Sequence, residues 1–217
     1  MSSLSCQCPA AAAIATIPNV ACPENFGQIQ KVAFQRLRLA DGTPNSMTDA
    51  NIKLLATWQT ALAATNGSKI VVSPYINAPA DGGGDARMSS GGNDDLGGIA
   101  EVLGSESVQF TGQLRSIPQD VIATMKQLMC EAQAGNLGVF LFDENGNIEG
   151  LKTVGTSTTW APIPIRALFI GDKIHGNFDA RDANAIQWNY LPGYSDKLDI
   201  VKPTDFNPLT DLVPASS

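Results

Sequence analysis

The segment from Phe110 to Leu151, FTGQLRSIPQDVIATMKQLMCEAQAGNLGVFLFDENGNIEGL, constrains the fold of this chain most. Residues 107–115 alternate in polarity, which predicts a strand. A helix is predicted to follow over 117–134, with Ser116 as its N-cap and Gln119 as the reciprocal partner of a capping box. Gly135 is predicted to end this helix, because glycine readily takes the left-handed conformation found there.

The second half of the segment predicts a hairpin. Residues 137–142, LGVFLF, are almost all apolar, which is typical of a strand that is buried on both faces or within an assembly. Asn145-Gly146 is a strong hairpin signal, and the chain should return over 147–151. Asp143 and Glu144 are expected to be turn formers rather than a catalytic acid/base pair. The best-specified part of the sequence is therefore scaffold without chemistry.

The remaining segments predict further strands and one more helix. Residues 28–39, 69–73, 163–170, 185–190 and 197–201 are interpreted as strands. Pro164 favours an edge position for its strand, because proline cannot donate a ladder hydrogen bond. A capping box at Ser46–Asp49 starts a helix over about 48–65, which buries Trp58.

This pattern predicts an α+β, mainly β fold: an antiparallel β-sandwich or barrel with two flanking helices. A single β-rich domain should span residues 28–203. An extended N-terminal arm over 1–27 and a C-terminal tail over 204–217 flank it.

A glycine-rich segment, residues 81–98, interrupts the β-rich region. It holds seven glycines in eighteen positions, so we expect a long mobile loop without packed structure. Its carboxylates would repel phosphate, and it has neither a P-loop pattern nor the ligand order of an EF-hand. A plain linker, an assembly loop and a calcium-binding loop remain alternatives. The residues of the candidate assembly loop are Asp81, Gly82, Gly83, Gly84, Asp85, Arg87, Asp94 and Asp95.

Charge narrows the possible partners. The formal net charge is −7, and no Lys/Arg run is present, so sequence-specific binding to nucleic acid is not expected. Charged residues make up 16% of the chain, against about 25% in a typical soluble protein, which suggests that partners cover much of the surface. No apolar run reaches the length of a membrane span. The N-terminus lacks a basic region and contains Pro9 and Pro18, so we interpret it as an arm rather than an export signal.

Candidate chemical groups are few. Cys6, Cys8 and Cys22 lie in the arm, where free thiols, a disulfide from Cys22 to either neighbour, and a zinc site remain alternatives. The single histidine, His175, is expected in a surface turn, and no nucleophile-elbow motif is present. We therefore predict no catalytic residue, no metal and no cofactor. Trp160 and Trp188 are expected in the core, with sugar stacking as the alternative.

The order of segments resembles virion structural proteins of tailed phages, in particular tail tube proteins of Bacteroidetes-type phages. The resemblance rests on QIQKVAFQRLRL, the long loop, VQFTGQLRSIPQ, LGVFLFDENGNIEG and DIVKPTDFNPL. It implies a β-sandwich or barrel with one flanking helix, assembled into stacked, usually hexameric rings. Arms and a long loop would join the rings, and the lumen would conduct DNA. The second predicted helix and the cysteines depart from this pattern.

The resulting expectation is a self-assembling structural protein of the virion, assembled in the host bacterial cytoplasm. Its partners would be other copies of itself and other virion proteins, with transient, non-specific passage of DNA and no membrane contact. A capsid decoration, connector or neck protein is the alternative within the same class. A secreted β module that binds carbohydrate or calcium is the alternative from another class.

Overall fold

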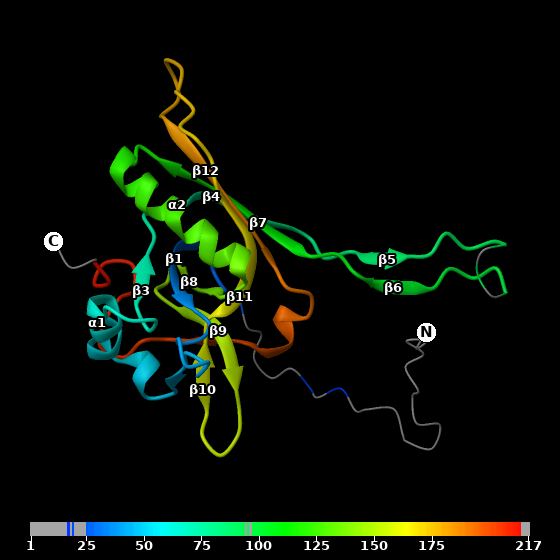
Figure 1. The fold of residues 1–217 in the computed structure, drawn as a ribbon, viewed down its shortest axis with the longest axis horizontal. Helices are drawn as coiled ribbons and strands as arrows, with labels where there is room; N and C mark the ends of the chain where they lie inside the picture. The colour runs from blue at the N-terminus through cyan, green and yellow to red at the C-terminus, as the bar shows by residue number, and fades with distance from the viewer. Residues whose placement is uncertain (1–16, 18, 20–24, 94, 96, 214–217) are drawn as a thin grey trace.

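The structure, a computed structural model, describes residues 17, 19, 25–93, 95 and 97–213. It is mainly β: a curled antiparallel sheet forms a half-barrel, two helices flank it, and a long β-hairpin projects from it (Figure 1). The predicted fold class is confirmed.

The large sheet follows the strand order β2-β10-β9-β8-β11-β12-β7-β4, and β1, β3 and β13 branch from this path. Its strands are β1 (Ile29–Arg36), β2 (Met47–Thr48), β3 (Ile70–Val72), β4 (Asn77–Gly83), β7 (Val108–Arg115), β8 (Leu137–Asp143), β9 (Ile148–Thr153), β10 (Thr159–Ala161), β11 (Ile163–Ile170), β12 (Ala183–Tyr190) and β13 (Leu198–Val201). A separate two-stranded sheet consists of β5 (Ala86–Met88) and β6 (Val102–Ser105). The helices are α1 (Leu55–Ala63), α2 (Gln119–Ala134) and the short 3₁₀ helices η1 (Asn51–Lys53) and η2 (Tyr194–Lys197).

Strand β8 is the centre of the molecule, and all seven of its residues are buried, as its apolar sequence predicted. Strand β1 pairs with β8 over the whole length of β8. Strands β11 and β9 each pair with a shorter part of β8. Its side chains divide between two hydrophobic clusters. Val139 and Leu141 join the cluster under α2, whereas Phe140 and Phe142 join the cluster that contains Trp58.

The hairpin after β8 forms as predicted, with Gly146 at φ 75°. The Asp143 carboxylate is buried in the turn, where it accepts hydrogen bonds from the backbone N–H groups of Asn145 (2.9 Å) and Asn147 (2.7 Å). It also accepts bonds from the Asn147 side chain (2.7 Å) and the Gly27 N–H (3.2 Å). Asp143 is a turn former, which confirms its interpretation.

Helix α2 covers the first cluster through Ile122, Met125 and Ala132, and ends at Gly135 in the left-handed conformation (φ 74°). This left-handed φ favours glycine, whereas the nearby Arg166 guanidinium is the end of a flexible side chain that can move aside. The predicted cap at Ser116 is wrong. Pro118 precedes the helix and no side chain caps it, while Ser116 has φ 55° and its N–H donates to the Asp182 carbonyl.

Helix α1 is shorter than the predicted 48–65. Met47 and Thr48 instead pair with β10 as the short strand β2, so the predicted capping box is wrong. The first turn is capped from a distant segment: the Leu55 N–H donates to Asp205 Oδ1 at 3.0 Å. Trp58 is buried as expected. Its indole lies edge-on to Phe140 at 5.3 Å, and its N–H donates to the Ile52 carbonyl.

The edge position predicted from Pro164 is wrong, because β11 lies inside the sheet. Its first residues, Ile163 and Pro164, pair with β8, and the pairing with β12 begins only at Ile165. A bulge follows at Ala167 (φ 51°), where the register shifts. Proline is tolerated because β11 changes partners at this point.

The expected C-terminal tail packs on the body over its described part. Leu212 is buried in the second cluster, and Phe206 and Leu209 pack against it. The Leu209 carbonyl accepts a hydrogen bond of 2.6 Å from Lys31 Nζ, so this segment is tied to β1.

Candidate assembly surfaces

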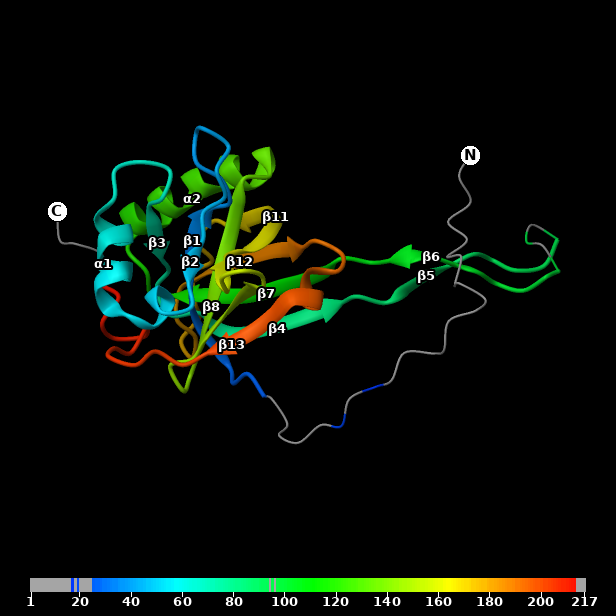
Figure 2. The same cartoon turned by 90° about the horizontal axis from the view of Figure 1, so that it is seen from below.

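The glycine-rich segment is part of a long hairpin. Strands β4 and β7 leave the body side by side and continue into β5 and β6, here called the arm (residues 84–107), which projects far from the body (Figures 1 and 2). Within the segment predicted as a loop over 81–98, residues 81–83 and 86–88 form strands instead, and the other described residues are irregular. Asp81, Gly82 and Gly83 belong to β4, and Arg87 belongs to β5.

Glycine is needed where the body strands give way to the arm. Gly83 and Gly84 have φ 88° and 86°, and a Cβ on Gly83 would lie 2.8 Å from the Ser107 carbonyl oxygen. An L side chain is unfavourable at such φ values. These glycines thus mark the break between β4 and β5, just before Asp85.

Near its tip the arm is held by Asp95. The carboxylate accepts hydrogen bonds from Ser89 Oγ (2.7 Å) and the Gly91 N–H, and Ser89 Oγ accepts one from the Glu101 N–H (2.7 Å). Asp94 lies outside the described residues. Within the described part of the chain, no group of three or more His, Cys, Asp or Glu residues could hold a metal ion.

The arm exposes apolar side chains that have no hydrophobic core to cover them. Met88 and Val102 are paired across the two strands, so both point to one face. Met88 is 50% exposed and Val102 is 66% exposed, and Ile99 and Leu103 are similarly open to solvent. Every residue of β5 and β6 is exposed. A concentration of this kind on a projecting element is typical of a contact surface.

Two further hairpins project from the body (Figure 1). The β9–β10 hairpin carries the exposed Val154, and the β11–β12 hairpin carries Ile174 and the fully exposed Phe178. His175 lies in the latter, with Nδ1 3.5 Å from Asp182 Oδ2. Its surface-turn interpretation is confirmed by its 82% exposed side chain.

Two acidic residues, Asp81 on β4 and Glu149 on β9, lie close enough for the charge of Asp81 to act on Glu149. Burial first, and then the charges of Asp81 and Asp143, together raise the pKa of Glu149 to about 7. Burial also raises the pKa of Asp81. Beside them Tyr190 and Tyr194 stack with ring centroids 4.4 Å apart, and these two carboxylates raise the pKa of both tyrosines, after the larger effect of burial. Glu149 was not among the site residues predicted from the sequence. Its only signal is a charged side chain near the start of a strand, between Ile148 and Gly150.

Both tryptophans proposed as sugar-stacking residues are in the core, so that alternative role is wrong. Trp160 is 1% exposed and donates to Asp49 Oδ1 at 2.9 Å, and Trp188 is fully buried and stacks on Phe110 at 3.9 Å. Cys6, Cys8 and Cys22, in the predicted N-terminal arm over 1–27, lie outside the described residues. No helix in the described part of the chain is long and apolar enough to cross a membrane.

No protein-family model matches the chain, and no curated protein matches it. Among solved structures, it is similar to a chain in the tail of an empty GTA particle, computed with helical refinement in C6 symmetry. The two chains are 11% identical, and the match covers 59% of this chain and 87% of the other, with a TM-score of 0.31. That TM-score is too low to assign a fold or a function.

Proposed function

We propose that this chain is a structural protein of a tailed-phage virion, and that it self-assembles as a tail tube subunit. Copies would form stacked rings of six, whose lumen conducts DNA. The observation that carries the proposal is the arm, which forms paired strands and yet buries none of the residues of β5 and β6. Ordering an arm costs conformational entropy that only contacts with another molecule can offset.

The open half-barrel supports the same role. Among the described strands, β4 pairs only with β7, and β13 pairs only with β9, so each has an unpaired edge. Unpaired edges invite pairing with another chain. In a ring, neighbouring subunits cover these edges, and closure of the ring limits further growth in that direction.

The charge balance supports passage of DNA without retention. The net charge is −7, and binding to phosphates needs cations, so a lumen lined by such a protein would hold DNA weakly. The proposed role is structural rather than catalytic. The proposed partners are further copies and other virion proteins, and the proposed location is the phage particle, assembled in the host cytoplasm.

Electron microscopy of the purified full chain, over a range of protein concentrations, tests this proposal. Rings of six that stack into tubes are the expected result. A species that stays monomeric at every concentration would overturn self-assembly. Trimers or twelve-fold rings that never stack would instead favour a decoration, connector or neck protein, and would overturn the tail tube assignment.

A further inference from the structure

An apolar groove lies on the body between α2, β3 and the C-terminal segment. Its volume is about 570 Å³. Its apolar lining comes from Val71, Pro74, Val121, Met125, Leu212 and Val213. Lys31 and Asp120 add one charge of each sign to the lining. The groove is thus an apolar surface with few polar groups, suited to apolar side chains rather than to a charged ligand.

The groove and the arm lie at opposite ends of the molecule. In both views, β3, α1 and the described end of the C-terminal segment stand at one end, and the arm stands at the other (Figures 1 and 2). The arm therefore points away from the groove of its own chain. An apolar projection at one end and an apolar hollow at the other give a head-to-tail contact between two copies.

Strand β3 also has a free edge beside the groove. Among the described strands it pairs only with β1, through Ala33, Phe34 and Gln35. Val71 and Val72 of this strand line both the groove and its continuation toward α1, where Lys69 stands. An extended segment that enters here can meet unpaired backbone groups as well as apolar side chains.

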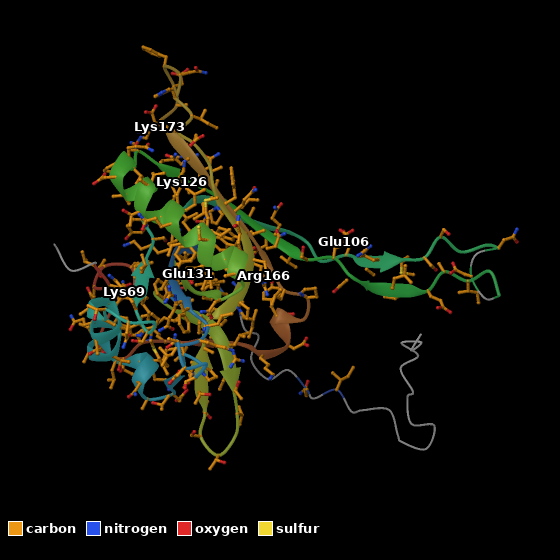
Figure 3. All side chains as sticks on the ribbon, viewed as in Figure 1. Lys69, Glu106, Lys126, Glu131, Arg166 and Lys173 are labelled. Atoms are coloured by element: carbon orange, nitrogen blue, oxygen red, sulfur yellow. The ribbon has the colours of Figure 1, made fainter. Side chains whose placement is uncertain are left out.

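Charge favours the arm as the occupant. The arm carries five acidic residues and a single arginine, Arg87, so more than half of the net charge of the chain lies on it. The groove and its continuation carry Lys31 and Lys69 against Asp120. Glu131 lies farther along α2, where Arg36 neutralises it. Figure 3 shows Lys69 at the groove end of the molecule and Glu106 on the arm.

We propose that the groove receives the arm of a second copy of this chain, and this inference rests on the self-assembly proposed above. The paired Met88 and Val102 side chains fill the apolar hollow, and the acidic residues of the arm lie near Lys31 and Lys69. Met88 is the fifth residue from Gly84, so at about 3.3 Å per residue it stands about 17 Å at most from the start of the arm. The contact therefore joins bodies that stand apart, as successive layers of an assembly do.

Two variants test the two sides of this contact. Val102→Glu places a charge on the apolar face of the arm, and Thr124→Trp blocks the groove, whose wall Thr124 helps to form. Both side chains are exposed in the single chain, so the fold should survive both changes. Matched controls are Val154→Glu, on the β9–β10 hairpin, and Ala123→Trp, an exposed residue of α2 that is not among the groove residues.

Sedimentation velocity and electron microscopy then compare the variants with the unchanged chain, after circular dichroism has shown equal melting temperatures. Val102→Glu and Thr124→Trp should each reduce the fraction of stacked rings at least tenfold and leave single rings, whereas the controls should stack normally. A mixture of the rings of the two variants should form stacks of two rings and no longer tubes, because Val102→Glu keeps an intact groove and Thr124→Trp keeps an intact arm.

Three outcomes would overturn this contact. Normal stacking of Thr124→Trp would reject the groove, normal stacking of Val102→Glu would reject the arm, and a mixture that remains single rings would reject their pairing. In each case the unchanged chain still assembles, so the proposed function would stand. A monomeric unchanged chain would overturn the proposed function itself, which is a separate result.

Discussion

The N–H of Leu55 donates a hydrogen bond of 3.0 Å to the carboxylate of Asp205, which lies 150 residues farther along the chain. Helix α1 has no side-chain cap from its own neighbourhood. The C-terminal segment thus supplies the acceptor that a local Ser, Thr, Asp or Asn usually provides. The same segment buries Leu212, so capping and packing fix it together.

Asp205→Ala should lower the free energy of unfolding by about 1 kcal/mol, because it removes this cap. Chemical denaturation monitored by circular dichroism measures the change. Asp196→Ala, at an exposed carboxylate in η2, serves as the control and should alter stability by less than about 0.5 kcal/mol. Equal stabilities of the two variants would show that Asp205 does not cap α1.

Asp143→Ala should destabilise the protein by about 3 kcal/mol or more. It removes a buried carboxylate and leaves the partly buried N–H groups of Gly27, Asn145 and Asn147 without their acceptor. Urea denaturation gives the difference. Glu144→Gln, at the exposed next residue, should stay within about 0.5 kcal/mol of the unchanged protein. A small effect of Asp143→Ala would mean that water replaces the carboxylate at little cost.

Trp58→Ala should cost about 3–5 kcal/mol, because it opens a cavity against Phe140 and Phe142. Phe178→Ala removes an equally aromatic side chain that is fully exposed, and should leave the melting temperature unchanged. Thermal unfolding of both variants makes the comparison. Similar melting temperatures for the two would contradict the burial of Trp58 in the second cluster.

Glu149 should make the protein less stable as pH rises. Its carboxyl has a pKa of about 7 when folded, above the ordinary value of 4.5 that applies to the unfolded chain. Below pH 4.5 both states are protonated and Glu149 has no effect. Between pH 4.5 and 7 the unfolded chain releases the proton while the folded chain keeps it, so unfolding is favoured, and above pH 7 the loss is constant.

Glu149→Gln should therefore be more stable than the unchanged protein at pH 8 and equal to it at pH 4. Denaturation curves at several pH values between these limits give the difference. Asp81→Asn should move the fall in stability to lower pH, because the charge of Asp81 helps to raise the pKa of Glu149. The same pH dependence in the unchanged protein and Glu149→Gln would rule out this carboxyl as the cause.

The sequence predicts best the elements whose causes are local. Gly135, Gly146 and the apolar run of β8 act within a few residues, and each was interpreted correctly. The errors arise where a distant segment decides. Thr48 pairs with Thr159 in β10 instead of entering a helix, and no local pattern reveals that partner.

The candidate assembly surfaces likewise combine features that nearby residues determine with features that distant segments determine. The composition pointed to the glycine-rich segment, but its start was interpreted as a loop, because Gly82 and Gly83 pair with Gln109 and Val108 of β7, which lie far along the chain. The approach of Asp81 to Glu149 depends on the curl of the whole sheet. The apolar groove combines residues from β3, α2 and the C-terminal segment, which no single stretch of sequence brings together.

The exposure of every residue in β5 and β6 has a consequence for variation. Because the arm shares no core with the half-barrel, its length and sequence can change without a large change in the stability of the body. The arm is also the place in this molecule where a foreign peptide can be inserted with the least disturbance to folding.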